Sequence, residues 1–135
     1  MGRKLFCEIN PTCYKISVQK ERLIRFIKDF FSNNKFSKTY YKDELPNIVK
    51  SHSSVLVRKL HGVDIKLQEN KITNIELACK RINGLIIKPG EVFSYWKIVG
   101  DPSKKKGYKE GLVISKKGFT TGYGGGLCQM ANIKL

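Results

Sequence analysis

The sequence predicts an α+β fold, a single mixed domain of residues 1–135 with short strands, two or three helices and a glycine-rich loop that leads into a C-terminal helix. Apolar residues follow helical spacing in some segments and form short strand-like runs in others. The chain is 41% hydrophobic and 27% charged over 135 residues, which is typical of one globular domain.

The N-terminal third combines three kinds of pattern. Residues 3–18 alternate loosely around Pro11, which predicts two short strands joined by a turn. From about Val18 to Phe31 the apolar residues follow helical spacing, which predicts a helix. The polar stretch 33–54 contains Pro46 and predicts a loop-rich segment.

The middle of the chain predicts two strands and a helix. Short apolar runs at 55–57 and 63–67 indicate strands, separated by a turn at His61-Gly62. A helical stripe follows over 72–82, and Gly84 ends it because glycine adopts the left-handed cap easily. The stripe consists of Ile72, Ile75, Cys79 and Ile82.

The C-terminal third predicts more strands around a dense apolar segment. Residues 85–87 form a strand that runs to a turn at Pro89-Gly90, and residues 112–114 form another, with a turn at Lys117-Gly118. The aromatic-rich stretch 92–98 is expected to be core, and its Trp96 is expected to be buried rather than to be a stacking platform.

The last nine residues have the pattern of an apolar helix that begins at Leu127. It stops at Leu135 after little more than two turns, without a capping residue, so we expect a domain that is incomplete at its C-terminus. Its apolar side chains would then lack a partner surface. These are Leu127, Met130, Ala131, Ile133 and Leu135.

The net charge of +15 is spread evenly along the chain. Residues 1–60 carry 13 basic and five acidic side chains, and residues 61–135 carry 13 and six. This predicts salt-sensitive adhesion to polyanions such as anionic wall polymers, and no specific nucleic-acid recognition. The densest basic stretch, Lys104-Lys105-Lys106, is interpreted as a solvated loop, with phosphate or wall-anion binding as the alternative.

Targeting signals and cysteine usage together predict a cytoplasmic protein. No signal peptide is visible, and no run approaches the ~18 apolar residues of a membrane span. The four cysteines form no paired motif, which predicts free thiols and no metal site, and no cofactor is expected. They are Cys7, Cys13, Cys79 and Cys128.

The glycine run Gly124-Gly125-Gly126 is the motif with the most chemical content. It matches neither a P-loop nor a dinucleotide-binding fingerprint, and it brings Cys128 to the start of a helix, where partial positive charge raises the thiolate fraction. Its amides are candidate oxyanion donors, and Gln129 is a further donor. The alternative is a tight turn with Cys128 as a small buried hydrophobic residue.

A cysteine nucleophile needs a base, and the sequence does not assign one. His52 and His61 are the two histidines of the chain, and neither stands at a spacing that pairs it with Cys128. Carboxylates are sparse, and none forms the acid pair of a glycosidase.

Five motifs follow one another from residue 82 onward. They are Ile82-Asn83-Gly84, Lys88-Pro89-Gly90-Glu91-Val92-Phe93-Ser94, Val99-Gly100, Lys106-Gly107-Tyr108-Lys109-Glu110-Gly111 and Gly124-Gly125-Gly126-Leu127-Cys128-Gln129. They resemble the successive motifs of the VanW family. Residues 3–9 and 67–71 resemble its short, leaderless members, and the likeness is strongest over 64–132.

The resemblance implies a link to peptidoglycan metabolism or glycopeptide resistance, with a peptidoglycan peptide or precursor as partner. In some larger exported relatives the cysteine that matches Cys128 is assigned as the nucleophile of an L,D-transpeptidase. Family members continue into a histidine-containing segment, so we expect the base to lie there and these 135 residues alone to be inactive. The alternative is a non-catalytic basic module that binds anionic wall or precursor ligands.

Overall fold

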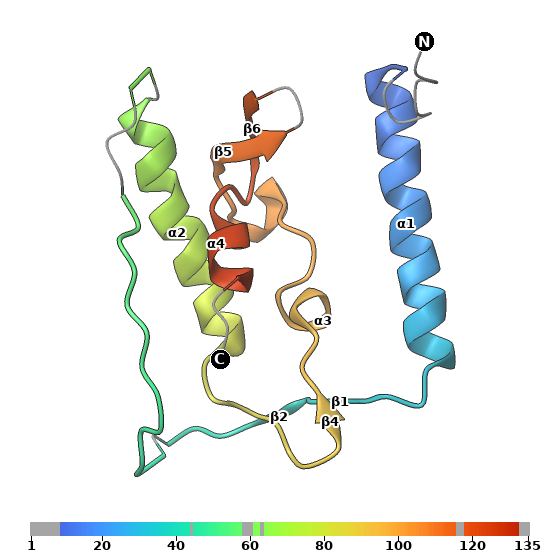
Figure 1. The fold of residues 1–135 in the computed structure, drawn as a ribbon, viewed down its shortest axis with the longest axis vertical. Coiled ribbons are helices and arrows are strands. Elements are labelled where there is room, and N and C mark those ends of the chain that lie inside the picture. Colours follow the sequence, from blue (N-terminus) through green and yellow to red (C-terminus); the bar gives the residue numbers. More distant parts are fainter. Residues whose placement is uncertain (1–8, 44, 58–60, 63, 116–117, 133–135) are drawn as a thin grey trace. The chain divides into compact units, whose positions relative to one another are not determined.

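The computed structural model describes residues 9–43, 45–57, 61–62, 64–115 and 118–132 (Figure 1). The chain divides into two compact units, residues 1–35 and residues 36–135. The secondary structure is mixed α and β, as predicted. Helices provide most of the regular structure, and the strands form small two-stranded sheets.

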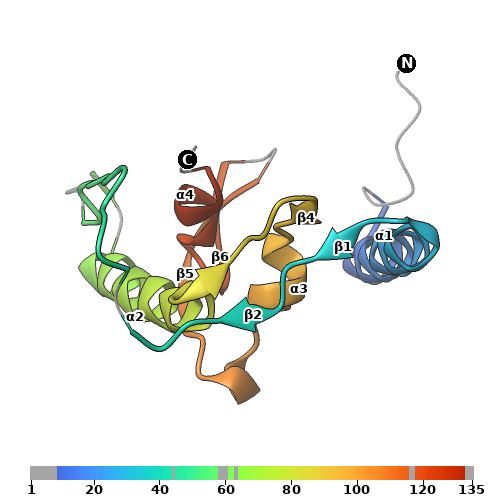
Figure 2. The same ribbon diagram turned by 90° about the horizontal axis from the view of Figure 1, so that it is seen from below.

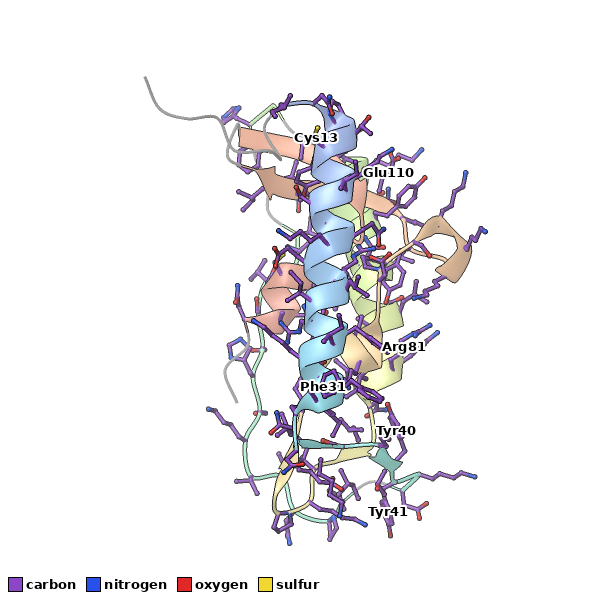
Figure 3. All side chains as sticks on the ribbon, turned by 90° about the vertical axis from the view of Figure 1, so that its right-hand side faces the viewer. Cys13, Phe31, Tyr40, Tyr41, Arg81 and Glu110 are labelled. Atoms are coloured by element: carbon purple, nitrogen blue, oxygen red, sulfur yellow. The ribbon has the colours of Figure 1, made fainter. Side chains whose placement is uncertain are left out.

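The first unit is built on one long helix, α1 (Pro11–Phe31), whose ends lie near the labelled Cys13 and Phe31 in Figure 3. Asn10 caps it, because its side-chain oxygen accepts a hydrogen bond of 2.7 Å from the backbone N–H of Cys13. The predicted strand before residue 18 is therefore wrong, since Asn10 and Pro11 start a helix instead of making a turn. The other predicted strand lies mostly outside the described residues.

The second unit is organised around α2 (Ile65–Ile82). Asp64 caps this helix by accepting a 2.9 Å hydrogen bond from the N–H of Lys66, so the strand predicted over 63–67 is wrong within the described residues. No strand forms at 55–57 either. The helix predicted over 72–82 is confirmed as the C-terminal part of α2, and Gly84 follows it with φ of +77°.

Short strands fix the two chain segments that flank α2. The loop-rich stretch 33–54 contains β1 (Lys35–Phe36) and β2 (Thr39–Tyr40), and β3 (Leu85–Ile86) and β4 (Glu91–Val92) come after the helix. β2 pairs antiparallel with β3, which is the unlabelled yellow arrow next to β2 in Figure 2. The predicted strand after α2 is thereby confirmed.

A hairpin of β5 (Glu110–Ser115) and β6 (Gly118–Tyr123) packs along α2. Its antiparallel register pairs Glu110 with Tyr123 at the open end and Ser115 with Gly118 at the turn. The strand predicted over 112–114 is confirmed inside β5. The turn predicted at 117–118 lies partly outside the described residues.

The core of the second unit lies where α2 meets α3 (Tyr95–Val99) and α4 (Leu127–Ala131). The second unit also contains a 3₁₀ turn (Lys104–Lys106). α3 was not predicted, and it turns Trp96 outward, so this side chain is 53% exposed rather than core. The buried hydrophobic residues are Ala78, Val99, Tyr108 and Leu127, with Leu77, Ile82, Tyr95 and Met130 packed against them.

Two predictions about buried faces need correction. Cys79, in the predicted apolar stripe of α2, is exposed, whereas its neighbour Ala78 is fully buried against the core. Leu127 and Met130 were expected to lack a partner, but both pack in the core cluster. Ala131 is exposed, and residues 133–135 lie outside the described part. Among the described helices, none combines the length and the apolar character that a membrane span requires.

Candidate functional site

The glycine turn is anchored to α2 by one buried asparagine. The side chain of Asn74 is fully buried, and its Nδ2 donates to the carbonyl oxygens of Lys109 and Gly125, each at 3.0 Å. Its Oδ1 accepts a 2.8 Å hydrogen bond from the N–H of Lys109. One turn earlier, Asn70 donates to the carbonyl oxygen of Glu110 at 2.9 Å. The two asparagines therefore tie both the start of β5 and the turn after β6 to a single helix.

Each glycine of the turn fits a space that excludes a side chain. A Cβ at Gly125 would overlap the backbone of Gly111 and lie 2.8 Å from the amide nitrogen of Leu112. Gly124 and Gly126 have φ of +79° and +94°, a region that favours glycine. Added Cβ atoms there would collide with the side chains of Pro102 and Lys71, respectively. The run is therefore required on steric grounds.

Cys128 is exposed at the first turn of α4. This contradicts the alternative in which it is a small buried hydrophobic residue. The backbone N–H groups of Gly126 and Cys128 donate to no acceptor among the described residues, whereas that of Leu127 donates to the carbonyl oxygen of Gly124 at 3.2 Å. Because α4 has five residues, the partial positive charge that the sequence predicted at its start is small.

Gln129 points its amide at another loop. Its Nε2 donates to the hydroxyl of Ser54 at 2.6 Å and to the carbonyl oxygen of Val55 at 3.4 Å. This contact fixes the segment that carries His52, two residues before Ser54, against α4. Sequence spacing gave no sign of it. His61 is exposed in a turn with Gly62, as predicted.

Tyr95 packs against the core cluster, as the sequence pattern indicated. Its hydroxyl is buried and has no hydrogen-bond partner among the described residues. Burial, with smaller contributions from the negative charges that Tyr108, Cys128 and Cys79 carry when ionised, raises the pKa of Tyr95 to about 12. The phenol therefore stays neutral at physiological pH, within electrostatic reach of Cys128.

The raised pKa of Tyr95 predicts a loss of stability at high pH. Below about pH 10 the Tyr95 phenol is protonated in both the folded and the unfolded state. Above about pH 10 it ionises in the unfolded chain before it ionises in the folded protein, so the free energy of unfolding falls as the pH rises toward about 12. The wild type should lose more stability than Tyr95→Phe between about pH 9 and pH 11 in denaturant melts. Tyr95→Phe removes the phenol hydroxyl and leaves every other side chain unchanged, so it controls for the rest of the protein. Equal losses would show that Tyr95 ionises freely in the folded state.

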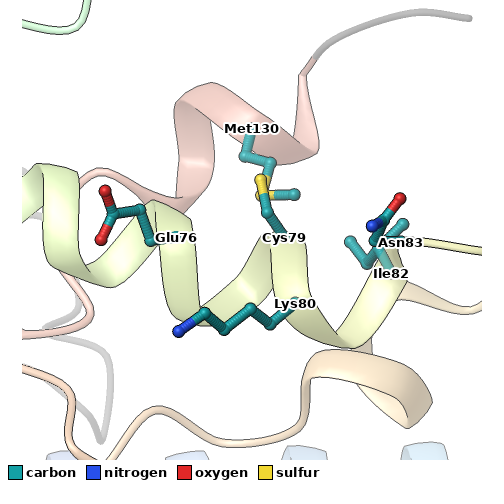
Figure 4. A pocket seen from close by; sticks show the side chains of 6 residues that line it. All are labelled: Glu76, Cys79, Lys80, Ile82, Asn83 and Met130. Atoms are coloured by element: carbon teal, nitrogen blue, oxygen red, sulfur yellow. The ribbon is translucent and has the colours of Figure 1, made fainter.

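An open cavity of about 660 Å³ lies between α2 and α4 (Figure 4). The close-up shows Cys79 on α2 and Met130 on α4 among the lining side chains, with Glu76 and Lys80 directed to different sides. Ile82 and Asn83 complete the lining. Met130 lies two residues after Cys128, so the cavity adjoins the helix that carries the thiol. No cluster of potential metal ligands occurs among the residues that the structure describes.

Comparisons with known proteins agree with this arrangement of motifs. The family model described as VanW like protein matches residues 70–134, which include the asparagine anchors, the hairpin and the glycine turn. The chain is 34% identical over 133 residues to the vancomycin B-type resistance protein VanW of Enterococcus faecalis, covering 98% of this chain and 48% of that protein. The chain belongs to the VanW family.

A second relative matches a shorter part. It is the uncharacterized protein YoaR of Bacillus subtilis, 39% identical over 59 residues, which cover 44% of this chain and 20% of that protein. The chain thus spans about half the length of the first relative. No solved structure matches the chain.

Proposed function

We propose that Cys128 is the nucleophile of an acyl-transfer reaction on a cell-wall-type peptide. The observation that carries the proposal is the exposed thiol two residues after a sterically fixed glycine turn, together with the N–H groups of Gly126 and of Cys128 itself, which have no acceptor among the described residues. The similarity to a protein named for vancomycin resistance supports a substrate from the cell wall or its precursors.

In the proposed reaction the Cys128 thiolate attacks the carbonyl carbon of a peptide bond. The N–H groups of Gly126 and Cys128 stabilise the oxyanion, the C–N bond breaks, and the leaving amine takes up a proton. A thioester remains, and a second amine or water attacks it and restores the thiol. The proton of Cys128 must pass to a base. His52 is the candidate among the described residues, and a residue beyond this chain is the other.

The test compares Cys128 with Cys79, a matched control because both are exposed and Cys79 lies within a regular helix. In a Cys7→Ser, Cys13→Ser background, iodoacetamide labelling at pH 7 is followed at each site by mass spectrometry. We expect Cys128 to react about tenfold faster, because the backbone N–H groups of Gly126 and of Cys128 itself have no acceptor among the described residues, whereas Cys79 lies within a regular helix. Equal or slower labelling of Cys128 would overturn the proposal.

The basic, non-catalytic module is the second candidate, favoured by the exposed lysines of the 3₁₀ turn Lys104–Lys106. It would bind an anionic wall polymer with an affinity that falls as salt rises and that Cys128→Ser leaves unchanged. A cytoplasmic location stays a prediction from the sequence.

A further inference from the structure

The orientation of one peptide group links Asn74 to Cys128. Because the carbonyl oxygen of Gly125 accepts the hydrogen bond from Asn74, that oxygen points toward α2. In a planar trans peptide the C=O and the following N–H point in opposite directions. The structure contains no cis peptide bond among its described residues. The N–H of Gly126 therefore points away from α2.

The N–H of Cys128 points back toward the same turn. In the first turn of a helix the backbone N–H groups point toward the N-terminal end, where no preceding carbonyl of the helix can accept them. For Cys128 that end is the glycine turn. Neither this N–H nor that of Gly126 has an acceptor among the described residues.

We propose that Asn74 is a positioning residue for the thiol site: its buried side-chain amide sets the Gly125–Gly126 peptide so that the Gly126 N–H joins that of Cys128 as a pair of donors. This inference rests on the proposed function of Cys128 and adds to it. Asn74 touches neither the thiol nor a substrate, and it acts through the backbone of the turn. The three hydrogen bonds determine the orientation of the Asn74 amide. Exchanging its oxygen and nitrogen would place the NH₂ group against the Lys109 N–H, which is also a donor.

The informative substitution is Asn74→Asp. It keeps the size of the side chain and an acceptor for the Lys109 N–H, but a carboxylate cannot donate to the carbonyl oxygens of Gly125 and Lys109. Asn70→Asp is the matched control. It makes the same charge change one turn earlier on the same helix and removes a hydrogen bond to Glu110 instead.

Two measurements distinguish a positioning role of Asn74 from a general contribution to stability. In ¹H–¹⁵N NMR spectra, Asn74→Asp should shift the Gly126 and Cys128 amide resonances and Asn70→Asp should not. The ratio of Cys128 to Cys79 labelling should fall about tenfold in Asn74→Asp alone, because the thiol site loses one of its two donors. Unmoved Gly126 and Cys128 resonances, or equal effects of both variants, would overturn the positioning role.

Wild-type protein provides a further measurement in case Asn74→Asp does not fold. The Asn74 side-chain amide protons should be protected from hydrogen exchange and show nuclear Overhauser contacts to Gly126. Rapid exchange without such contacts would refute the inference. If the wild-type Cys128 shows no labelling advantage over Cys79, the proposed acyl transfer fails, and the NMR results still decide whether Asn74 orients the turn.

Discussion

The substitution Gly125→Ala is expected to destabilise the second unit by about 3 kcal/mol or more, the largest effect of any single added methyl group in the turn region. The new Cβ would overlap the backbone of Gly111, and backbone cannot move aside as the end of a flexible side chain can. Relief requires separating the turn from β5, which would also strain the hydrogen bond between Asn74 and the Gly125 carbonyl.

Gly90→Ala is the control for this substitution. Gly90 has φ of +79°, and an added Cβ there meets no atom within 4 Å. Gly90→Ala should lower the free energy of unfolding by about 1–2 kcal/mol, because it places a side chain in the left-handed region. Denaturant melts of both variants measure the difference. If Gly125→Ala lowers the free energy of unfolding by no more than Gly90→Ala, the turn and β5 are not in close contact in solution. Gly125→Ala should also remove the labelling advantage of Cys128.

The elements that the sequence predicted well are those whose signals are local. A glycine after an apolar helical run marked the end of α2, and Gly84 has the expected positive φ. The short apolar runs at 85–87 and 112–114 became β3 and part of β5 because strand-like runs bounded by turns need little tertiary context. The start of α4 after Gly126 was likewise visible in the pattern.

The errors arose where one residue type serves two local structures. Asparagine followed by proline suits a turn and also the start of a helix, and α1 begins there because Asn10 caps it. Asp64 acts in the same way for α2. In both cases the residues beyond the cap had been predicted as strand, since a few apolar residues do not distinguish a strand from a helix.

The candidate site was predictable only in part. The glycine run singled out Cys128, and the structure places this thiol at the surface after a fixed turn. The groups around it come from distant segments, so their roles depend on tertiary contacts. Asn74 lies 51 residues from its partner Gly125, and Gln129 lies 75 residues from Ser54. A polar residue inside a helix carries no sign in the sequence that it will be fully buried.

The buried position of Leu127 predicts the second large effect. Leu127→Ala should lower the free energy of unfolding by about 3 kcal/mol. The side chain is a member of the core cluster with Ala78 and Val99, and truncation would leave a cavity at the contact of α2 with α4. Ile114→Ala is the matched control, because this equally large side chain is 80% exposed and should change stability by less than about 0.5 kcal/mol.

Chemical denaturation of the two variants tests whether the short helix that carries Cys128 is held by its own packing. Since a five-residue helix gains little from its own hydrogen bonds, α4 depends on Leu127 and Met130 for its position. Leu127→Ala should therefore also lower the labelling rate of Cys128 relative to Cys79. A small loss of stability, similar to that of Ile114→Ala, would mean that Leu127 is not packed in solution, and that α4 needs a surface beyond these residues to hold the thiol in place.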